Sequence, residues 1–212
     1  MNNKTSQSWN NHYTRDTSML AYPDEQLVRM IKKNTINKHR ALDAGCGTGR
    51  HVKLLNENGF DCVIGVDISY NALKQSQSLL DNIFIQCSID KLPFGDSSFD
   101  AVIAWGSLHY AQKELLPCML AEIKRVLSSE GIVYGTLRSA HDTYIGQGKH
   151  LGNNTWETSL PDIQGAVISL YTLNEVKKYL GIFKEFHIGL MERTLIDELD
   201  KKLSHWYFYA KV

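Results

Sequence analysis

The segment Leu42–Gly49 carries the residues whose types and spacing point most directly to chemistry. Its sequence, LDAGCGTG, places Gly45, Gly47 and Gly49 at every second position after an apolar run. Glycine permits positive φ and lets a ligand lie against bare backbone, and the first turn of a following helix offers free N–H groups. The segment therefore predicts a ligand-binding turn between a buried strand and a helix.

Two carboxylates indicate what this turn binds. Dinucleotide folds use Gly-x-Gly-x-x-Gly, whereas the spacing here is Gly-x-Gly-x-Gly, and Asp43 would repel a pyrophosphate next to the first glycine. Asp43 instead favours a cationic ligand. Asp67 ends the next apolar run, about 18 residues after Gly49, the usual distance for a carboxylate that binds ribose hydroxyls. Both elements point to one nucleoside ligand.

Charge and composition limit the partners. The 212 residues contain 23 Lys and Arg and 23 Asp and Glu, so no global cationic field favours nucleic acid or an anionic membrane. No apolar run approaches the ~18 residues of a membrane span, and Met1–Asn11 lacks the apolar core of a signal peptide. We therefore expect a cytoplasmic protein that binds a small molecule. The cysteines show no metal spacing and are expected to be free, mostly buried thiols: Cys46, Cys62, Cys87 and Cys118.

Short apolar runs alternate with helix-period stretches and predict the elements that position these residues. The runs expected to form buried parallel strands are Arg40–Ala44, Cys62–Val66, Ile83–Gln86, Ala101–Ala104 and Ile132–Thr136. The stretches expected to form helices are Asp24–Lys33, Arg50–Asn58, a segment from about Asn71 capped by Ser69, and Leu116–Leu127. This alternation predicts an α/β fold with a doubly wound sheet.

The pattern changes after residue 138. Ser139–Leu170 is rich in Gly, Asn, His, Tyr and Trp and is expected to be an irregular lid or substrate wall. A capping box at Thr172–Glu175 predicts a helix that ends at Gly181, and strand-like composition returns in Phe183–Met191 and His205–Val212. No linker divides the chain. We expect a single domain, 1–212, made of a cover (1–38), a cofactor-binding core (39–138), a lid (139–171) and a C-terminal helix with strands (172–212).

The motifs together resemble class I S-adenosylmethionine-dependent methyltransferases of the small-molecule type. Besides Leu42–Gly49, the matching pieces follow the family's order: Val66–Ser69, Leu92–Asp100, Ala101–Tyr110, and Ile123–Leu127 with Gly131. The resemblance implies a Rossmann-like, seven-stranded sheet of order 3-2-1-4-5-7-6 whose last strand, about Ser204–Lys211, is antiparallel. It also implies S-adenosylmethionine as the cofactor and methyl transfer to a small-molecule acceptor.

The resemblance also implies which residues contact the cofactor. In the family the glycines approach its methionine and ribose portions, and the acidic residue after the second strand binds the ribose hydroxyls. The positions implied here are Tyr13, Asp43, Gly45, Cys46, Gly47, Gly49, Asp67, Ile68, Ser88, Ile89 and Trp105. The family usually has an acidic side chain four positions before the leucine of its Leu-Pro-Phe motif. That position is Ser88 here, and Asp90 lies two positions later.

The expected chemistry needs little more than alignment. The cofactor's sulfonium is a good leaving group, so an enzyme can act by bringing nucleophile and methyl into line and excluding water. His109, just beyond the fourth strand, is the candidate general base, with a structural role as the alternative. His141, Tyr144 and Trp156 are expected at the same pocket, with Trp9–Tyr13 as a cover over it.

Some methyltransferase classes are excluded, and two other functions remain open. The turn after the fourth strand lacks the Asn/Asp-Pro-Pro-Tyr sequence of enzymes that act on nucleobases or glutamine. Trp105 and Gly106 stand where a metal-dependent catechol-type enzyme needs carboxylates, so no metal is expected. The alternatives are a non-catalytic partner subunit that binds the cofactor and a nucleotide-dependent oxidoreductase.

Overall fold

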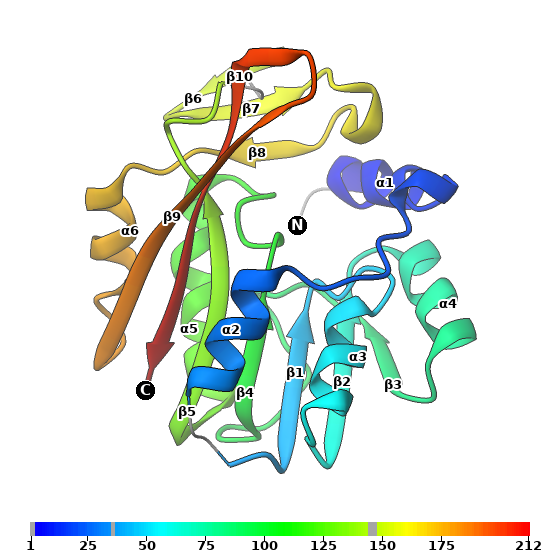
Figure 1. The fold of residues 1–212 in the computed structure, drawn as a ribbon, viewed down its shortest axis with the longest axis vertical. Coiled ribbons are helices and arrows are strands. Elements are labelled where there is room, and N and C mark those ends of the chain that lie inside the picture. Colours follow the sequence, from blue (N-terminus) through cyan, green and yellow to red (C-terminus); the bar gives the residue numbers. More distant parts are fainter. Residues whose placement is uncertain (1–2, 35–36, 144–147) are drawn as a thin grey trace.

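A seven-stranded sheet lies at the centre of the computed structural model, which describes residues 3–34, 37–143 and 148–212 (Figure 1). Across the sheet the strands are β3 (Ile83–Gln86), β2 (Cys62–Asp67), β1 (Arg40–Ala44), β4 (Phe99–Ala104), β5 (Leu127–Arg138), β10 (Glu198–Lys211) and β9 (Glu185–Leu195). The first five are parallel, and β10 is antiparallel to both β5 and β9. The α/β class and the predicted order, with an antiparallel last strand inside the sheet, are confirmed.

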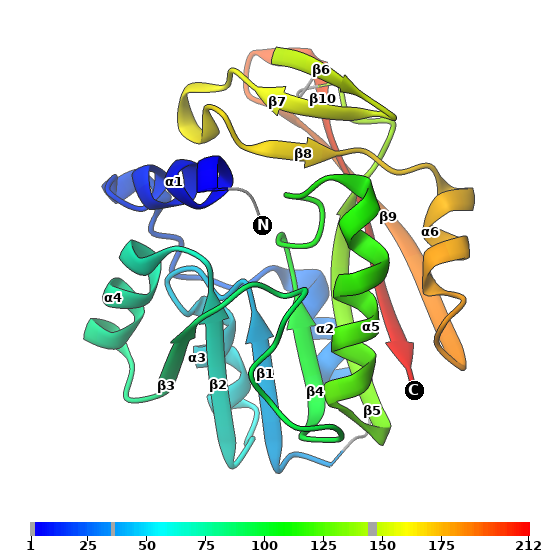
Figure 2. The ribbon, with the colours of Figure 1, turned by 180° about the vertical axis from the view of Figure 1, so that it is seen from behind.

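Helices cover both faces of this sheet (Figures 1 and 2). One layer consists of α2 (Glu25–Lys33), α3 (Arg50–Glu57) and α4 (Tyr70–Leu79), and the other of α5 (Leu116–Val126) and α6 (Leu173–Leu180). Strand residues alternate between the two layers: Ala41 packs with the first core and Leu42 with the second. Because both faces are covered, the central strands β1, β2 and β4 are mainly apolar and buried, which explains why apolar runs located them.

Side-chain caps fix where the helices begin. Asp24 accepts a hydrogen bond from the Gln26 amide at 2.9 Å at the start of α2, and Ser69 accepts one from the Ala72 amide at 3.2 Å at the start of α4. Thr172 and Glu175 form the predicted capping box of α6, whose C-cap is Gly181. These caps satisfy amides that would otherwise lack partners at a helix N-terminus.

The helix α1 (Asn3–His12) was not predicted, because the leading helix was expected only at Asp24. Its sequence is almost entirely polar and has no apolar face that would mark a helix. Polar contacts with other parts of the chain hold it instead. Ser69 and Asn71, at the start of α4, donate side-chain hydrogen bonds to Asn10 at 2.9 and 3.0 Å. Tertiary contacts, not local propensity, therefore account for this helix.

The expectation of an irregular Ser139–Leu170 stretch was wrong. The described part contains a three-stranded antiparallel sheet of β6 (Gly148–Gly152), β7 (Thr155–Thr158) and β8 (Val167–Ser169), here called the small sheet, which lies beyond the carboxyl ends of the central strands (Figure 1). Asn153 and Asn154 have φ of +48° and +51° and form the turn between β6 and β7. Two successive positive-φ residues, often Asn, are typical of tight hairpin turns.

The cysteines are less buried than predicted. Cys46 is buried and Cys87 is half-buried. Cys62 and Cys118 are exposed, because Cys62 is the first residue of β2 and Cys118 lies on the outer face of α5. All four are free thiols. Within the described ranges, no helix is long and apolar enough to cross a bilayer.

Candidate functional site

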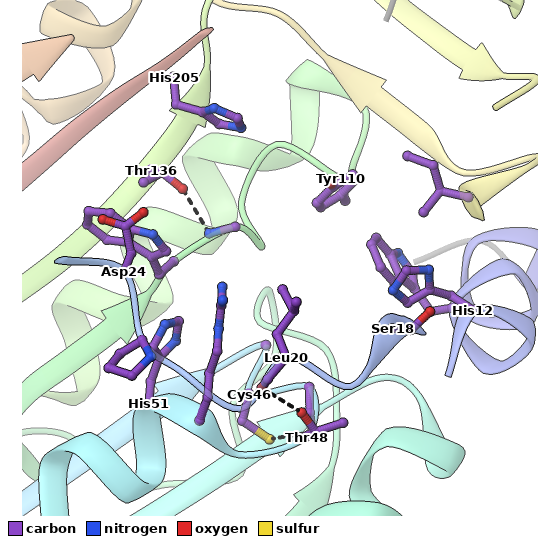
Figure 3. Close-up of a pocket in the computed structure, with 18 of the residues that line it drawn as sticks. His12, Ser18, Leu20, Asp24, Cys46, Thr48, His51, Tyr110, Thr136 and His205 are labelled. Atoms are coloured by element: carbon purple, nitrogen blue, oxygen red, sulfur yellow. Dashed lines mark hydrogen bonds between the residues drawn. The ribbon is translucent and has the colours of Figure 1, made fainter. Parts of the chain in front are cut away.

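A cavity of about 570 Å³ lies between the glycine turn, α1 and the ends of β5, β9 and β10 (Figure 3). Leu20, Cys46 and Thr48 lie on one side of it, with His205 and Tyr110 on the other. Of the positions implied for cofactor contact, five line this cavity: Tyr13, Gly45, Cys46, Gly47 and Trp105. A volume of this size suits a small-molecule site.

The glycine turn connects β1 to α3 and has the backbone conformation that its sequence predicted. Gly45, Gly47 and Gly49 have φ of +86°, +53° and +86°. The amide of Gly45 donates to the Val66 carbonyl at 2.8 Å, which ties the turn to β2. Gly49 is the N-cap of α3 and lies away from this cavity, because its bare face packs on Leu80 of the α4 C-cap. Gly45 and Gly47 are therefore the two glycines of this turn that line the cavity.

Asp43 lies directly beneath this turn, fully buried. Neither carboxylate oxygen has a hydrogen-bond partner among the described residues, and the Nδ1 atom of the buried His51 ring lies 3.9 Å from Oδ1. An unpartnered buried carboxylate is costly unless a positive charge or a donor approaches it. Asp43 is not among the residues that line the cavity, and its role toward a cationic ligand stays a prediction.

Asp67 ends β2 with both carboxylate oxygens anchored. Its Oδ2 accepts from the Gly47 amide and its Oδ1 from the Ser69 amide, each at 2.8 Å. Burial raises the pKa of Asp67 to about 6, with a contribution from Asp43, although the two amide hydrogen bonds act in the opposite direction. The carboxylate is thus held beside the glycine turn and keeps lone pairs for further donors.

The segment from α1 to Tyr13 covers the end of β2 and one side of the cavity. Trp9 packs edge-on against Tyr110, with ring centroids 4.6 Å apart, and Tyr13 reaches the glycine turn. On its other flank α1 meets the 3-10 turn η3 (Pro161–Ile163): His12 Nδ1 lies 2.9 Å from the Asp162 carbonyl oxygen. This segment contacts both α4 and the region next to the small sheet, so it closes one side of the cavity.

The opposite wall is made by the ends of β5, β9 and β10. In the antiparallel register His205 lies opposite both Arg138 and Met191, and Leu203 lies opposite Arg193. Directly opposed residues of antiparallel strands point to the same face, so all five side chains face the cavity. These residues were not predicted from the sequence, because only the strand register brings them together.

His109, the candidate base, is not among the residues that line the cavity. Its ring is 0% exposed, and neither nitrogen has a hydrogen-bond partner among the described residues. The pKa of His109 lies well below its usual value because of burial, reinforced by His205 and Arg138. The ring centroid lies 5.5 Å from that of His205, which does line the cavity.

The aromatic and histidine candidates of the Ser139–Leu170 stretch that the structure describes do not line the cavity either. His141 lies beside Trp206 and 3.5 Å from Glu192, and Trp156 packs with the apolar cluster of the small sheet, so neither lines the cavity. Tyr144 lies outside the described residues. From the described part of Ser139–Leu170, Ile163 is the residue that lines the cavity.

The positions implied for the adenosine side lie outside the cavity. Ile89 is buried, and Ile68 and Ser88 are half-buried. The Ser88 hydroxyl donates to the Asp90 carboxylate. The serine that stands where the family usually has an acid is therefore hydrogen-bonded to the nearby acid. The Ile68 carbonyl accepts a hydrogen bond from Ser6 of α1 at 3.4 Å. α1 therefore lies over the side of the turn where adenosine is expected.

Comparisons with known proteins agree with this geometry. Residues 41–131 match a family described as a methyltransferase domain. A malonyl-[acyl-carrier protein] O-methyltransferase of Erwinia pyrifoliae is 31% identical over 141 residues, 63% of this chain and 52% of that protein. The mitochondrial arginine-hydroxylase of Homo sapiens is 31% identical over 105 residues, 49% of this chain and 30% of that protein. The chain thus spans about half or less of the length of these two relatives.

The fold has close counterparts among solved structures. A SAM-dependent methyltransferase from Methanosarcina mazei superimposes with a TM-score of 0.69 and 19% identity, covering 85% of this chain and 96% of that one. At this identity the likeness establishes the arrangement of strands and helices. The segment that contains the glycine turn and Asp67 is also the one with family similarity in sequence.

Proposed function

We propose that this chain, a class I S-adenosylmethionine-dependent methyltransferase by its family match over residues 41–131 and its fold, transfers a methyl group to a small-molecule acceptor. The observation that carries the proposal is the unpartnered, fully buried Asp43 carboxylate beneath a glycine turn that opens on the cavity. A sulfonium and an ammonium are the positive centres of S-adenosylmethionine, and both suit a buried anion.

The proposal assigns the two ends of the cofactor to different parts of the turn. Gly45, Gly47 and Asp43 would hold the methionine portion, with Tyr13 and Trp105 as walls. Asp67 would accept hydrogen bonds from the ribose hydroxyls, and Ile68, Ser88 and Ile89 would surround adenine. The family resemblance supports this assignment, as does the anchoring of Asp67 to Gly47 and Ser69.

When bound, S-adenosylmethionine supplies an electrophilic methyl group on a good leaving group. The chain has then to orient the acceptor and exclude water. Trp9, Tyr110 and Trp105 give the cavity aromatic walls that displace solvent. His205 lines the cavity, and its pKa is lowered to about 3 by burial and by Arg138 and Arg193, so its imidazole is neutral near pH 7. A neutral ring of this kind can orient an acceptor by hydrogen bonding without acting as a strong base.

The acceptor distinguishes this proposal from others on the same fold. One relative is a methyltransferase of a malonyl group and another is a hydroxylase of arginine, so the matched segment serves more than one chemistry. The cavity of about 570 Å³ supports an acceptor the size of a metabolite or of one side chain.

Titration with S-adenosylhomocysteine followed by a screen for its release tests the proposal. We expect binding by calorimetry, a raised melting temperature, and S-adenosylhomocysteine release from S-adenosylmethionine with at least one member of a metabolite library. Binding without turnover of any member would favour the non-catalytic partner subunit. Stabilisation by NADH but not by S-adenosylhomocysteine would favour an oxidoreductase and overturn the proposal.

A further inference from the structure

We infer that the acceptor carries an anionic oxygen group, a carboxylate or a phosphate, held by Arg138 of β5 and Arg193 of β9 on the wall of the cavity. The inference rests on the proposed function, because it assigns the substrate class of the same site. It goes further in naming the residues that select the substrate.

The strand register places the two arginines on one surface. Arg138 is opposite His205 in the β5 and β10 pair, and Arg193 is opposite Leu203 in the β10 and β9 pair. Leu203 and His205 are two residues apart on β10 and so point to the same face. The two guanidinium groups thus flank this pair of β10 side chains on the cavity side.

Arg138 has an unused donor. Its Nε atom donates to Asp142 Oδ2 at 2.7 Å, and that oxygen also accepts from the Ser204 amide at 2.8 Å. The residue is only 5% exposed, and its Nη2 atom makes no hydrogen bond within the described part of the chain, while the guanidinium as a whole pairs with Asp142 and interacts with the Tyr110 side chain. A buried guanidinium donor without a partner is costly, and a ligand oxyanion would satisfy it. Asp142 acts as a positioning residue that fixes the plane of the guanidinium.

Arg193 adds a charge that no acid neutralises. It makes no ion pair within 4.0 Å among the described residues, whereas Glu192, the preceding residue, turns to the other face and pairs with Lys202. The arginines that line the cavity are Arg50, Arg138 and Arg193, and the one carboxylate lining it in the described ranges is Asp24. Burial is the main cause of the lowered pKa of His205, and Arg138 and Arg193 lower this pKa further from the same wall.

The carboxylate of the cofactor is the rival occupant for these charges, and Arg50 is better placed to take it. Arg50 is the first residue of α3, directly after the glycine turn, and donates to the Tyr22 carbonyl at 3.2 Å. Arg138 and Arg193 come instead from the β5, β9 and β10 wall, and this separation leaves their oxyanion site to the acceptor.

Matched pairs of small ligands test the inference on protein saturated with S-adenosylhomocysteine. The probes are acetate, malonate and benzoate, their neutral amides, and inorganic phosphate, each titrated by calorimetry. We expect at least one anion to bind ten times or more tighter than its neutral counterpart, and added sodium chloride to weaken it. Preference for phosphate over every carboxylate would assign the site to a phosphorylated acceptor. Equal binding of anions and amides would overturn the inference.

Variants identify the residues responsible. Arg193→Gln, at an exposed position, should weaken the preferred anion about 5-fold or more and leave S-adenosylhomocysteine affinity within twofold. Arg138→Lys keeps a positive charge beside Asp142 but loses the forked N–H donors of the guanidinium. It should weaken binding of the preferred anion by a similar factor. Arg29→Gln, an exposed arginine of α2 paired with Glu25, is the control and should change neither.

The cofactor titration separates the two proposals. Protein that binds the anions but not S-adenosylhomocysteine would refute the proposed function while keeping the anion site. If Arg193→Gln and Arg138→Lys bound the anion as the unmodified protein does, while Arg50→Gln lost it, the anion would belong to the methionine subsite and the inference would fail.

Discussion

The hydroxyl oxygen of Tyr13 lies against Gly47, where it would clash with a Cβ atom at that position. The N-terminal segment and the glycine turn are thus in direct contact at the edge of the cavity. Burial raises the pKa of Tyr13 well above its usual value, with Asp67 and Cys46 adding to the effect, so this hydroxyl is a neutral donor. The contact joins the cover of the site to its binding turn.

Gly47→Ala should therefore weaken S-adenosylhomocysteine binding at least tenfold and lower the melting temperature. The new methyl group meets Tyr13, and φ of +53° is unfavourable for alanine, by about 1 to 2 kcal/mol. Tyr13→Phe in the same chain removes the nearest atom and should restore part of the stability. Calorimetry of the two single variants and the double variant measures the coupling. A coupling of zero would show that the contact is absent in solution.

Asp67→Ala should weaken S-adenosylhomocysteine binding by ~1–3 kcal/mol, through lost charge-assisted hydrogen bonds to the ribose. Asp61→Ala, at an exposed carboxylate just before β2, is the matched control and should bind normally. Circular dichroism checks that the variant folds, because the Gly47 and Ser69 amides lose their acceptor. Unchanged affinity in Asp67→Ala would remove this carboxylate from the site.

The affinity for S-adenosylhomocysteine should fall as the pH is lowered through about 6. Burial raises the pKa of Asp67 to about 6, so below that pH the carboxyl is protonated and must lose its proton to accept two hydroxyls. The loss should approach tenfold per pH unit. Calorimetry between about pH 5 and 7 measures it. Asp67→Ala should give a flat profile, and a flat profile in the unmodified protein would contradict the prediction.

His109→Phe should leave methyl transfer within a few-fold of the unmodified rate, once an acceptor is known. The ring is fully buried, does not line the cavity and uses neither nitrogen within the described structure, so a ring of similar size can replace it. The general-base hypothesis gives the opposite result. It requires a fall of about 10²-fold or more with a flattened pH profile.

Stability should decrease as the pH falls below about 6.5. Burial lowers the pKa of His109 well below its usual value and that of His205 to about 3. Both rings therefore stay neutral in the folded state while the unfolded chain takes up protons. Each histidine then costs up to about 1.4 kcal/mol of unfolding free energy per pH unit in this range. Denaturant titrations of His109→Phe should show a shallower loss; an identical slope would mean that His109 titrates normally.

The sequence located the half of the site that is built from consecutive residues. The bounds of β1 and β3, the caps Ser69 and Thr172, and the glycine turn all follow from local patterns. Such patterns are informative because turn conformation and helix starts depend on a few neighbouring residues.

The other half depends on pairings that no local pattern contains. Arg138, Arg193 and His205 meet only because of the register of three antiparallel strands, and each looks like an ordinary polar residue in the sequence. α1 lacks an apolar face, and the β6 and β7 hairpin depended on the Asn153 and Asn154 turn, which was not recognised. His109 follows a strand end in the sequence, yet its side chain is fully buried and does not line the cavity.

The position of β10 between β5 and β9 has a consequence for the order in which the protein folds. The small sheet, α6 and β9 all lie between β5 and β10 in the sequence, so the pairing of β5 with β10 closes a long loop. Contacts of such sequence separation form late, because the entropy of loop closure must first be overcome. The parallel strands β1 to β4 can assemble earlier with their helices. The wall made by β5, β9 and β10 should thus be the last part of the cavity to form. A folding intermediate would first acquire the side that contains the glycine turn and Asp67.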